Sequence, residues 1–105
     1  MVFVETATFT RRIMALLTDD EYALLQDDLM ERPDSGQLIP EGGGIRELRV
    51  AAKGHGKSGG ARVIYYWAVS RDRILLLRVY AKNEQSDLTR LEVRDLRRVA
   101  EEEFR

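Results

Sequence analysis

The sequence predicts an α+β fold, in which a small antiparallel β-sheet packs against an N-terminal helical hairpin and a C-terminal helix on one of its faces. Three observations support this prediction. Apolar residues recur with helical spacing in residues 7–32 and again after residue 89. Residues 45–82 instead alternate with a period of two, which is typical of strands. At 105 residues the chain is long enough for one modest core, so we expect residues 1–105 to form a single domain.

The N-terminal part is predicted to contain a short strand followed by two helices. Residues 2–5 (VFVE) are strand-like, and the helical hairpin follows over residues 7–32. Thr18 and Glu21 have the spacing of a capping box, which opens the second helix. We expect that helix to end before Pro33, because proline disfavours helical geometry in the residue that precedes it.

The C-terminal part is predicted to contain three strands and a final helix. The strands are IRELRVA (45–51), ARVIYYWAV (61–69) and ILLLRVYA (74–81). Thr89 and Glu92 form a second capping box, which opens the C-terminal helix.

The alternation of side chains divides these strands into two faces. Val63, Tyr65 and Trp67 share the face that belongs against the helices, and Leu75, Leu77, Val79 and Ala81 are expected to join them. The opposite face is expected to gather cations and tyrosines: Arg49, Arg62, Tyr66, Arg78, Tyr80 and Lys82. Cations suit phosphates and aromatic rings suit unstacked bases, so this face predicts binding of single-stranded nucleic acid. Ordinary strand propensity is the alternative explanation for the tyrosines, and a β-bulge would change the assignment of faces.

Charge is distributed unevenly along the chain, although the formal net charge is only −1. Residues 1–43 carry a net −6, residues 44–82 a net +7 and residues 83–105 a net −2. A basic middle segment between acidic segments indicates one surface for a polyanion. The alternative is a chance clustering of solvated charges.

The composition excludes several classes of protein. No apolar run approaches the roughly 18 residues that span a bilayer, and the N-terminus lacks the apolar segment of a secretory signal. The absence of cysteine excludes disulfides and thiolate metal sites, and a single histidine makes a protein-held zinc site unexpected. We therefore expect a cytoplasmic protein that holds no metal.

The loop GHGKSG (54–59) matches two nucleotide-binding patterns in letters but not in context. Both the G-x-G-x-x-G fingerprint and the P-loop require a following helix, and a strand follows here. The leading glycine of a P-loop would also fall on Ala51. What remains is a glycine-rich loop with Lys53, His55 and Lys57, whose backbone can approach an anion closely. A plain hairpin connection is the alternative.

The order of elements, the segments IRELRVAAKGHGKSGGARVIYYW and VYAKNEQSDLT, and the capped last helix together resemble the RelE/ParE superfamily of toxins from type II toxin–antitoxin systems. Within that superfamily the chain looks most similar to the HigB-type branch. The resemblance extends from residue 2 to the terminal helix. Its most specific parts are the patterns K-G-x-G-K-x-G-G-x-R-[VI]-I-Y-Y and Y-x-K-N-E-x-S-D-L.

The resemblance implies a RelE-like fold and a ribosome-dependent ribonuclease, without metal or cofactor, that cuts mRNA in the ribosomal A site and so inhibits translation. It also implies a partner antitoxin that holds the toxin inactive. The arginine of the family's G-x-R-[VI] pattern falls on Arg62, which is expected to stabilise the phosphate in the transition state. The basic or polar position after the last strand falls on Lys82 and Asn83. The preceding basic positions fall on Arg49, Lys53 and Lys57.

Metal-free cleavage of RNA begins with attack of a 2′-OH on the adjacent phosphorus, so it needs a base, an acid and a group that stabilises negative charge. Arginine suits the last task because it is always charged and binds phosphate through two hydrogen bonds. We assign Arg62 to phosphate stabilisation and Lys82 to proton transfer or charge stabilisation. Arg49, Lys53 and Lys57 would position the RNA backbone. His55 is a further candidate proton carrier.

Two other functions remain open at this stage. One is a toxin of the same fold that acts on gyrase, and the other is a non-catalytic RNA-binding module. Several relatives carry a histidine or tyrosine after the final strand, where this chain has Lys82, Asn83 and Glu84. The general acid and base, the codon preference, the antitoxin type and the oligomeric state are therefore left open.

Overall fold

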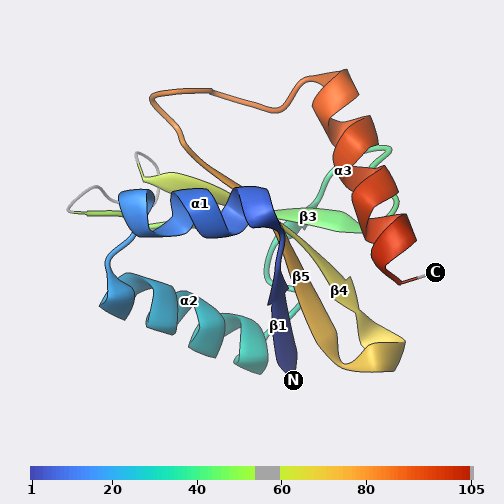
Figure 1. Cartoon of the computed structure of the whole chain (residues 1–105), viewed down its shortest axis with the longest axis horizontal. Helices are drawn as coiled ribbons and strands as arrows, with labels where there is room; N and C mark the ends of the chain where they lie inside the picture. The colour runs from blue at the N-terminus through green and yellow to red at the C-terminus, as the bar shows by residue number, and fades with distance from the viewer. Residues whose placement is uncertain (54–59, 105) are drawn as a thin grey trace.

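In residues 1–53 and 60–104, which the computed structural model describes, five strands form one sheet in the order β1-β5-β4-β3-β2 (Figure 1). Their bounds are β1 (Val2–Glu5), β2 (Gln37–Leu38), β3 (Ile45–Val50), β4 (Ala61–Ala68) and β5 (Arg73–Ala81). β2, β3, β4 and β5 pair antiparallel, whereas β1 runs parallel to β5. The α+β class is therefore confirmed, but the sheet is mixed. Alternation along a strand is the same in parallel and antiparallel pairs, so the sequence did not reveal this difference.

Each of the α-helices α1, α2 and α3 is capped at its N-terminus by a threonine. Their bounds are α1 (Ala7–Leu16), α2 (Asp19–Glu31), the 3₁₀ turn η1 (Val69–Arg71) and α3 (Arg90–Glu103). The Thr6 side chain caps α1, and the capping boxes expected at Thr18 and Thr89 are both present. Each box satisfies backbone N–H groups that have no partner within the helix, so it fixes where the helix starts. The C-cap of α2 is Arg32, next to Pro33 as expected.

One face of the sheet packs on the helical hairpin formed by α1 and α2. Phe9, Ile13, Leu17, Leu25 and Leu29 from the hairpin are buried there. From the sheet come Ala61, Val63, Tyr65, Ile74, Leu76 and Val79. We call this the hairpin face. The expected inward set of β4 is thus confirmed for the hairpin.

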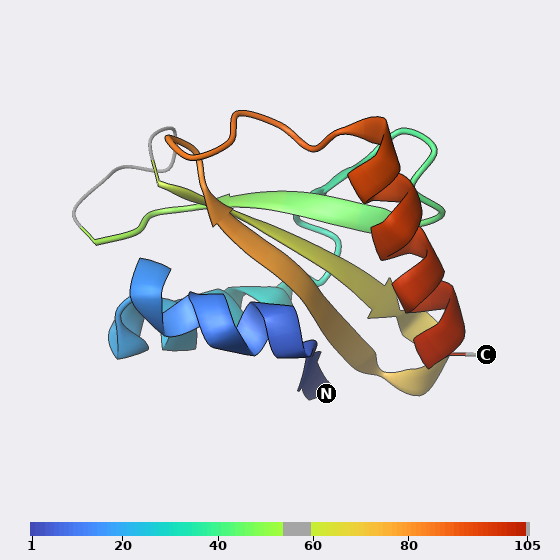
Figure 2. The same cartoon turned by 45° about the horizontal axis from the view of Figure 1, so that its top comes forward.

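The opposite face packs on α3, which corrects the expectation that all helices lie on one side. Ala100 and the partly buried Val93, Leu96 and Phe104 of α3 contact this face. Its sheet residues include Ile45, Ile64, Leu75, Leu77 and Tyr80. Figures 1 and 2 show α1 and α2 together on one side of the strands and α3 on the other. We call it the α3 face. The apolar stripe of α3 was visible in the sequence, but a stripe does not say which face of a sheet it covers.

A shift in register explains how β5 supplies apolar residues to both faces. The pairing with β4 moves between Ile64 and Tyr65, so that Leu77 is skipped. Leu75 and Leu77 consequently lie on the α3 face, whereas Val79 lies on the hairpin face. The expectation that these residues share one face is wrong, because a bulge reverses the side-chain alternation.

None of the helices in the described ranges is long and apolar enough to cross a bilayer.

Candidate functional site

Three strands meet at one end of the sheet. β3 ends there, β4 begins there and β5 ends there, and the register sets Arg49 opposite Arg62 and Arg62 opposite Tyr80. The backbone N–H of Lys82 donates to the carbonyl of Gly60 at 3.1 Å, which holds Lys82 beside the same strand end. The juxtaposition of these four side-chain positions, expected from alternation alone, is therefore found in the fold.

Arg62 is buried, with 2% of its surface exposed. Its Nε lies 3.5 Å from a carboxylate oxygen of Glu47, on the neighbouring strand β3. The Arg62 guanidinium also donates a hydrogen bond to the backbone carbonyl of the preceding residue, Ala61, at 3.3 Å. A buried charge is costly unless it is paired. The Glu47 carboxylate therefore stabilises the position in which Arg62 is held.

Tyr80 is buried as well, with 4% of its surface exposed. Among the described residues its hydroxyl has no hydrogen-bond partner. Burial raises the pKa of Tyr80 to about 12; the charges of Glu47 and Asp87 act in the same direction, and those of Arg62 and Arg78 oppose them. At neutral pH the hydroxyl is therefore protonated and can donate a hydrogen bond.

Arg78 is tied to the segment that leads into α3. Its guanidinium lies 2.6 Å from a carboxylate oxygen of Glu92 and 3.3 Å from the side-chain oxygen of Gln85. The Thr89 backbone N–H, then hydrogen bonding by Gln85 and the charge of Arg78, lower the pKa of Glu92 against the opposing effect of burial. Arg78, expected to contact RNA, thus anchors the start of α3 in this structure.

Lys53 contacts the helical hairpin. Its Nζ donates to the carbonyls of Ala15 at 2.8 Å and Met14 at 3.3 Å, near the C-terminus of α1. Its backbone N–H donates to both carboxylate oxygens of Glu21. A lysine amine at a helix C-terminus is favoured by the helix dipole and the unpaired carbonyls. RNA contact by Lys53 stays a prediction, and it would have to compete with these bonds.

Among the remaining predicted residues, Asn83 is exposed after β5 and Arg49 is exposed at the end of β3. His55 and Lys57 lie outside the described residues. Tyr66 is half-buried, with its ring 5.8 Å from that of Phe104 in the α3 region. The expectation that Tyr66 and Tyr80 line an open face for stacking bases is wrong for this structure, because α3 covers the face that carries them.

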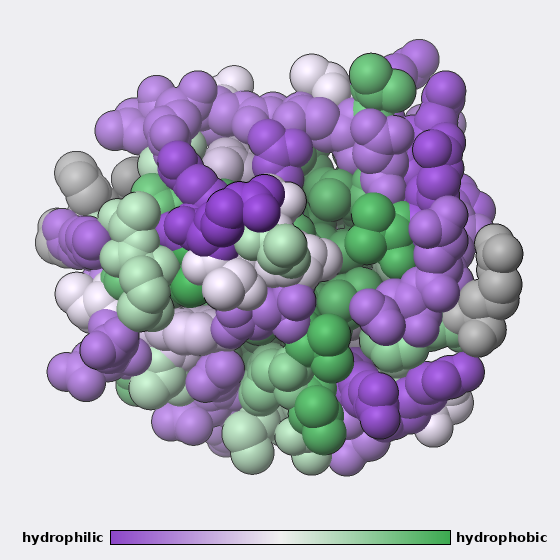
Figure 3. All heavy atoms as spheres, in the orientation of Figure 1, coloured by the Kyte–Doolittle hydropathy of each residue, from purple (hydrophilic) through white to green (hydrophobic). Residues whose placement is uncertain are grey.

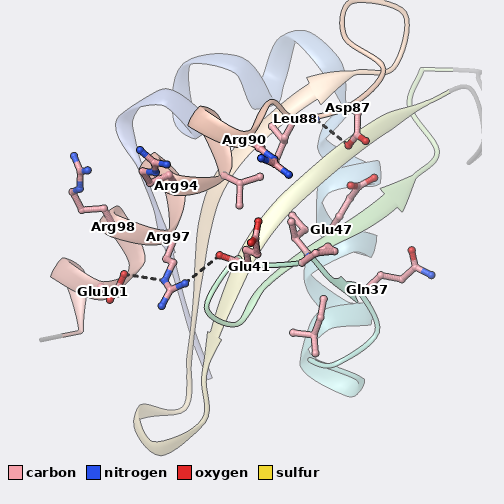
Figure 4. A pocket seen from close by; sticks show the side chains of 14 residues that line it. Gln37, Glu41, Glu47, Asp87, Leu88, Arg90, Arg94, Arg97, Arg98 and Glu101 are labelled. Carbon is pink, nitrogen blue, oxygen red and sulfur yellow. Dashed lines mark hydrogen bonds and ion pairs between the residues drawn. The ribbon is translucent and has the colours of Figure 1, made fainter.

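A groove of about 900 Å³ lies between α3 and the segment 37–41 (Figure 4). Glu47 and Asp87 stand at one end of it, and Arg98 and Glu101 stand at the other. Arg90, Arg94 and Arg97 of α3 also line it, and the α3 side of the molecule is mostly hydrophilic in Figure 3. The groove therefore gives solvent and polar ligands access to Glu47, the partner of Arg62.

Sequence reasoning did not identify Glu47 and Asp87 as part of this cluster. Alternation already put Glu47 on the same face as Arg49, which was the available signal. Asp87 lies in an irregular segment, where no periodicity predicts a position. Within the described ranges, no group of three His, Asp or Glu side chains is arranged to hold a metal ion. A paired arginine, a second arginine and a protonated tyrosine instead suit the binding of an oxyanion such as phosphate.

A comparison with protein families agrees with this arrangement. Residues 6–105 match the model described as "RelE toxin of RelE / RelB toxin-antitoxin system". The match covers nearly all of the chain and does not distinguish the HigB-type branch, which stays a prediction. Membership implies an antitoxin partner. With its mixed sheet, its helical hairpin and its strand arginine, the chain belongs to the RelE family of toxins from toxin–antitoxin systems.

Proposed function

We propose that this toxin is a ribosome-dependent endoribonuclease of the HigB type, which cleaves mRNA in the A site and inhibits translation in the cytoplasm. The observation that carries the proposal is the position of Arg62: a buried arginine in a paired strand, opposite Arg49 on β3 and Tyr80 on β5, with Lys82 following β5 at the same end of the sheet. A cation held by a sheet does not need to reorganise when charge develops on a phosphate.

The proposed reaction is an internal transesterification. The 2′-oxygen of the RNA forms a bond to the adjacent phosphorus, and the bond from phosphorus to the 5′-oxygen breaks. The proton of the 2′-OH passes to a base, and the leaving 5′-oxygen takes a proton from an acid. The products are a 2′,3′-cyclic phosphate and a 5′-OH, and no metal is needed to balance the step.

We assign the stabilisation of the extra negative charge to Arg62, whose planar guanidinium matches two phosphate oxygens. Lys82 is exposed just after β5, at the same end of the sheet, and serves either as a second cation or in proton transfer. Arg49 and the loop lysines position the backbone of the RNA.

Two features of the molecule support dependence on the ribosome. Residues 1–43 carry a net charge of −6, which repels free RNA from the hairpin side. Arg62 is 2% exposed and paired with Glu47, so a phosphate must first displace a carboxylate. We infer that the ribosome supplies the binding energy for this displacement by holding the mRNA in place.

The test is primer extension on a defined mRNA in a reconstituted translation reaction. Arg62→Ala should lower cleavage about 10²- to 10³-fold, the usual cost of removing one oxyanion-stabilising donor. Arg62→Lys keeps the charge but loses the paired geometry, and it should also be strongly impaired. The matched control is Arg73→Ala, an exposed strand arginine at the opposite end of β5. Thermal unfolding of each variant separates lost chemistry from lost folding.

Cuts that require ribosomes, persist in the Arg73 variant and vanish in both folded Arg62 variants would support the proposal. Intact mRNA with the wild-type toxin would overturn it. The specific observation that favours a second candidate is the sequence after β5, where Lys82 and Asn83 replace the histidine or tyrosine of several relatives. A non-catalytic RNA-binding toxin would protect the mRNA without cutting it, and a gyrase-directed toxin would instead inhibit supercoiling.

A further inference from the structure

The hydroxyl of Tyr80 is the one buried side-chain polar atom without a hydrogen-bond partner in the described part of the chain. Buried polar groups are nearly always paired, because an unpaired group loses its bonds to water and gains nothing in return. An unpaired hydroxyl in a native fold therefore calls for an explanation, and a ligand that pairs with it is the simplest one.

The surroundings of Tyr80 indicate which ligand this is. Tyr80 on β5 is paired in register with Arg62 on the neighbouring strand β4, and Arg62 is paired on its other side with Arg49 on β3. The pKa of Tyr80 also responds to four nearby charges, those of Glu47, Asp87, Arg62 and Arg78. A hydroxyl and a guanidinium are both hydrogen-bond donors, and a phosphate group has several oxygen atoms that can accept from both.

In this structure the Glu47 carboxylate is an oxyanion paired with Arg62. One of its carboxylate oxygens lies 3.5 Å from Nε of Arg62, which is long for a charged hydrogen bond. The Glu47 side chain is 24% exposed and lines the groove of Figure 4, so it has space to turn into when Arg62 takes another partner. The Glu47 carboxylate accepts no hydrogen bond from the Tyr80 hydroxyl, which has no acceptor within the described ranges.

We propose that the Tyr80 hydroxyl is a second donor to the phosphate group that Arg62 binds, and that the Glu47 carboxylate occupies this subsite until the phosphate displaces it. The inference deepens the proposed ribonuclease function and rests on it for the identity of the substrate. Tyr80 is then a catalytic residue that touches the substrate, and its ring is not a stacking platform for a base. Because its pKa is about 12, the hydroxyl keeps its proton at neutral pH and acts as a donor.

The first experiment compares Tyr80→Phe with Tyr65→Phe. Tyr65 is a matched control, since it is also a buried strand tyrosine. It lies on the hairpin face, and its hydroxyl already has two hydrogen-bond partners. We expect Tyr80→Phe to raise the Tm by a few degrees, because it removes an unpaired polar atom, and to lower kcat/KM for mRNA cleavage about 10- to 100-fold. Tyr65→Phe should lower the Tm and leave cleavage per folded molecule unchanged.

The second experiment measures binding directly, without requiring cleavage. Inorganic phosphate is titrated against the labelled protein, and the side-chain N–H signal of Arg62 is followed by NMR. Tyr80→Phe should weaken the affinity about 10-fold, whereas Tyr65→Phe should not change it. Glu47→Gln should tighten phosphate binding several-fold, and Glu101→Gln, at the far end of the same groove, should have no comparable effect.

The outcomes separate this inference from the proposed function. Normal cleavage and normal phosphate affinity in Tyr80→Phe would overturn the inference and leave the ribonuclease proposal standing. Weakened phosphate binding in Tyr80→Phe, with no cleavage by the wild type on ribosomes, would support the subsite and overturn the ribonuclease. If Glu47→Gln instead weakens phosphate binding, Glu47 positions Arg62, and the displacement step is wrong.

Discussion

Two tyrosines on neighbouring strands show how differently the two faces of the sheet are built. The hydroxyl of Tyr65, on the hairpin face, donates to the carbonyl of Pro33 at 2.8 Å and accepts from the backbone N–H of Gly36 at 2.9 Å. Gly36 permits this approach, because a Cβ there would lie 2.8 Å from the Tyr65 ring. The hydroxyl of Tyr80, on the α3 face, has no partner in the described ranges.

The difference extends to the residues around each tyrosine. The hairpin face buries apolar side chains from α1, α2, β4 and β5 in one cluster, and the hydroxyl of its buried Tyr65 is paired. The α3 face buries Arg62 and leaves the Tyr80 hydroxyl without a partner among the described residues, at a cost in stability. Groups that are kept at such a cost are typical of sites that bind a ligand, so the comparison assigns stability to one face and chemistry to the other.

The largest expected effect tests the stabilising role of the hairpin face. Phe9→Ala removes a fully buried ring from that face, and we expect a loss of about 3–5 kcal/mol in the free energy of unfolding. Leu96→Ala on α3 is the control, because Leu96 is only partly buried and should cost clearly less. Urea unfolding measures both. Equal losses would contradict the assignment of stability to the hairpin face.

A smaller effect concerns acid sensitivity at the start of α3. The pKa of Glu92 is lowered from its ordinary 4.5, chiefly by the Thr89 backbone N–H. A carboxylate with a lowered folded pKa stabilises the fold above pH 4.5, and that contribution disappears as the pH falls through the folded pKa. Glu92→Gln keeps the capping geometry but removes the charge opposite Arg78, so we expect it to lose about 1 kcal/mol at pH 7 and less at pH 3.

Urea unfolding at both pH values tests this prediction, with Glu102→Gln, an exposed position near the end of α3, as the control. The Glu102 variant should follow the wild type at both pH values. A loss in Glu92→Gln that is as large at pH 3 as at pH 7 would mean that the charge of Glu92 contributes nothing. The difference in stability between the hairpin face and the α3 face would then depend on packing alone.

The smallest expected effect concerns Lys53 and tests whether its amine stabilises α1 or contacts RNA. Lys53→Met removes the amine from the Met14 and Ala15 carbonyls, and we expect a loss of about 0.5 kcal/mol in the free energy of unfolding. Arg94→Met, on the exposed surface of α3, is the control for losing one positive charge. Unchanged stability together with reduced RNA cleavage would show that the amine serves the RNA and not α1.

Much of the fold was predictable because it depends on local chemistry. The capping boxes at Thr18 and Thr89 lie within four residues of sequence, and the alternation of β4 follows from strand geometry. The grouping of Arg49, Arg62 and Tyr80 also followed, because each lies on a regular part of its strand. The Lys53 contacts could not be predicted, since they join residues nearly forty positions apart.

The sequence by itself determined the α-helices, every strand except the short β2, the caps at Thr18 and Thr89, and the side of each strand that carries charge, because these depend on the spacing between near neighbours. Only the tertiary structure decided that β1 joins in parallel, that a bulge at Leu77 reverses part of β5, and that α3 covers the charged face. Those choices depend on which surfaces meet at long range. The same long-range packing buried Arg62 beside Glu47 and left the Tyr80 hydroxyl without a partner in the part of the chain that the structure describes.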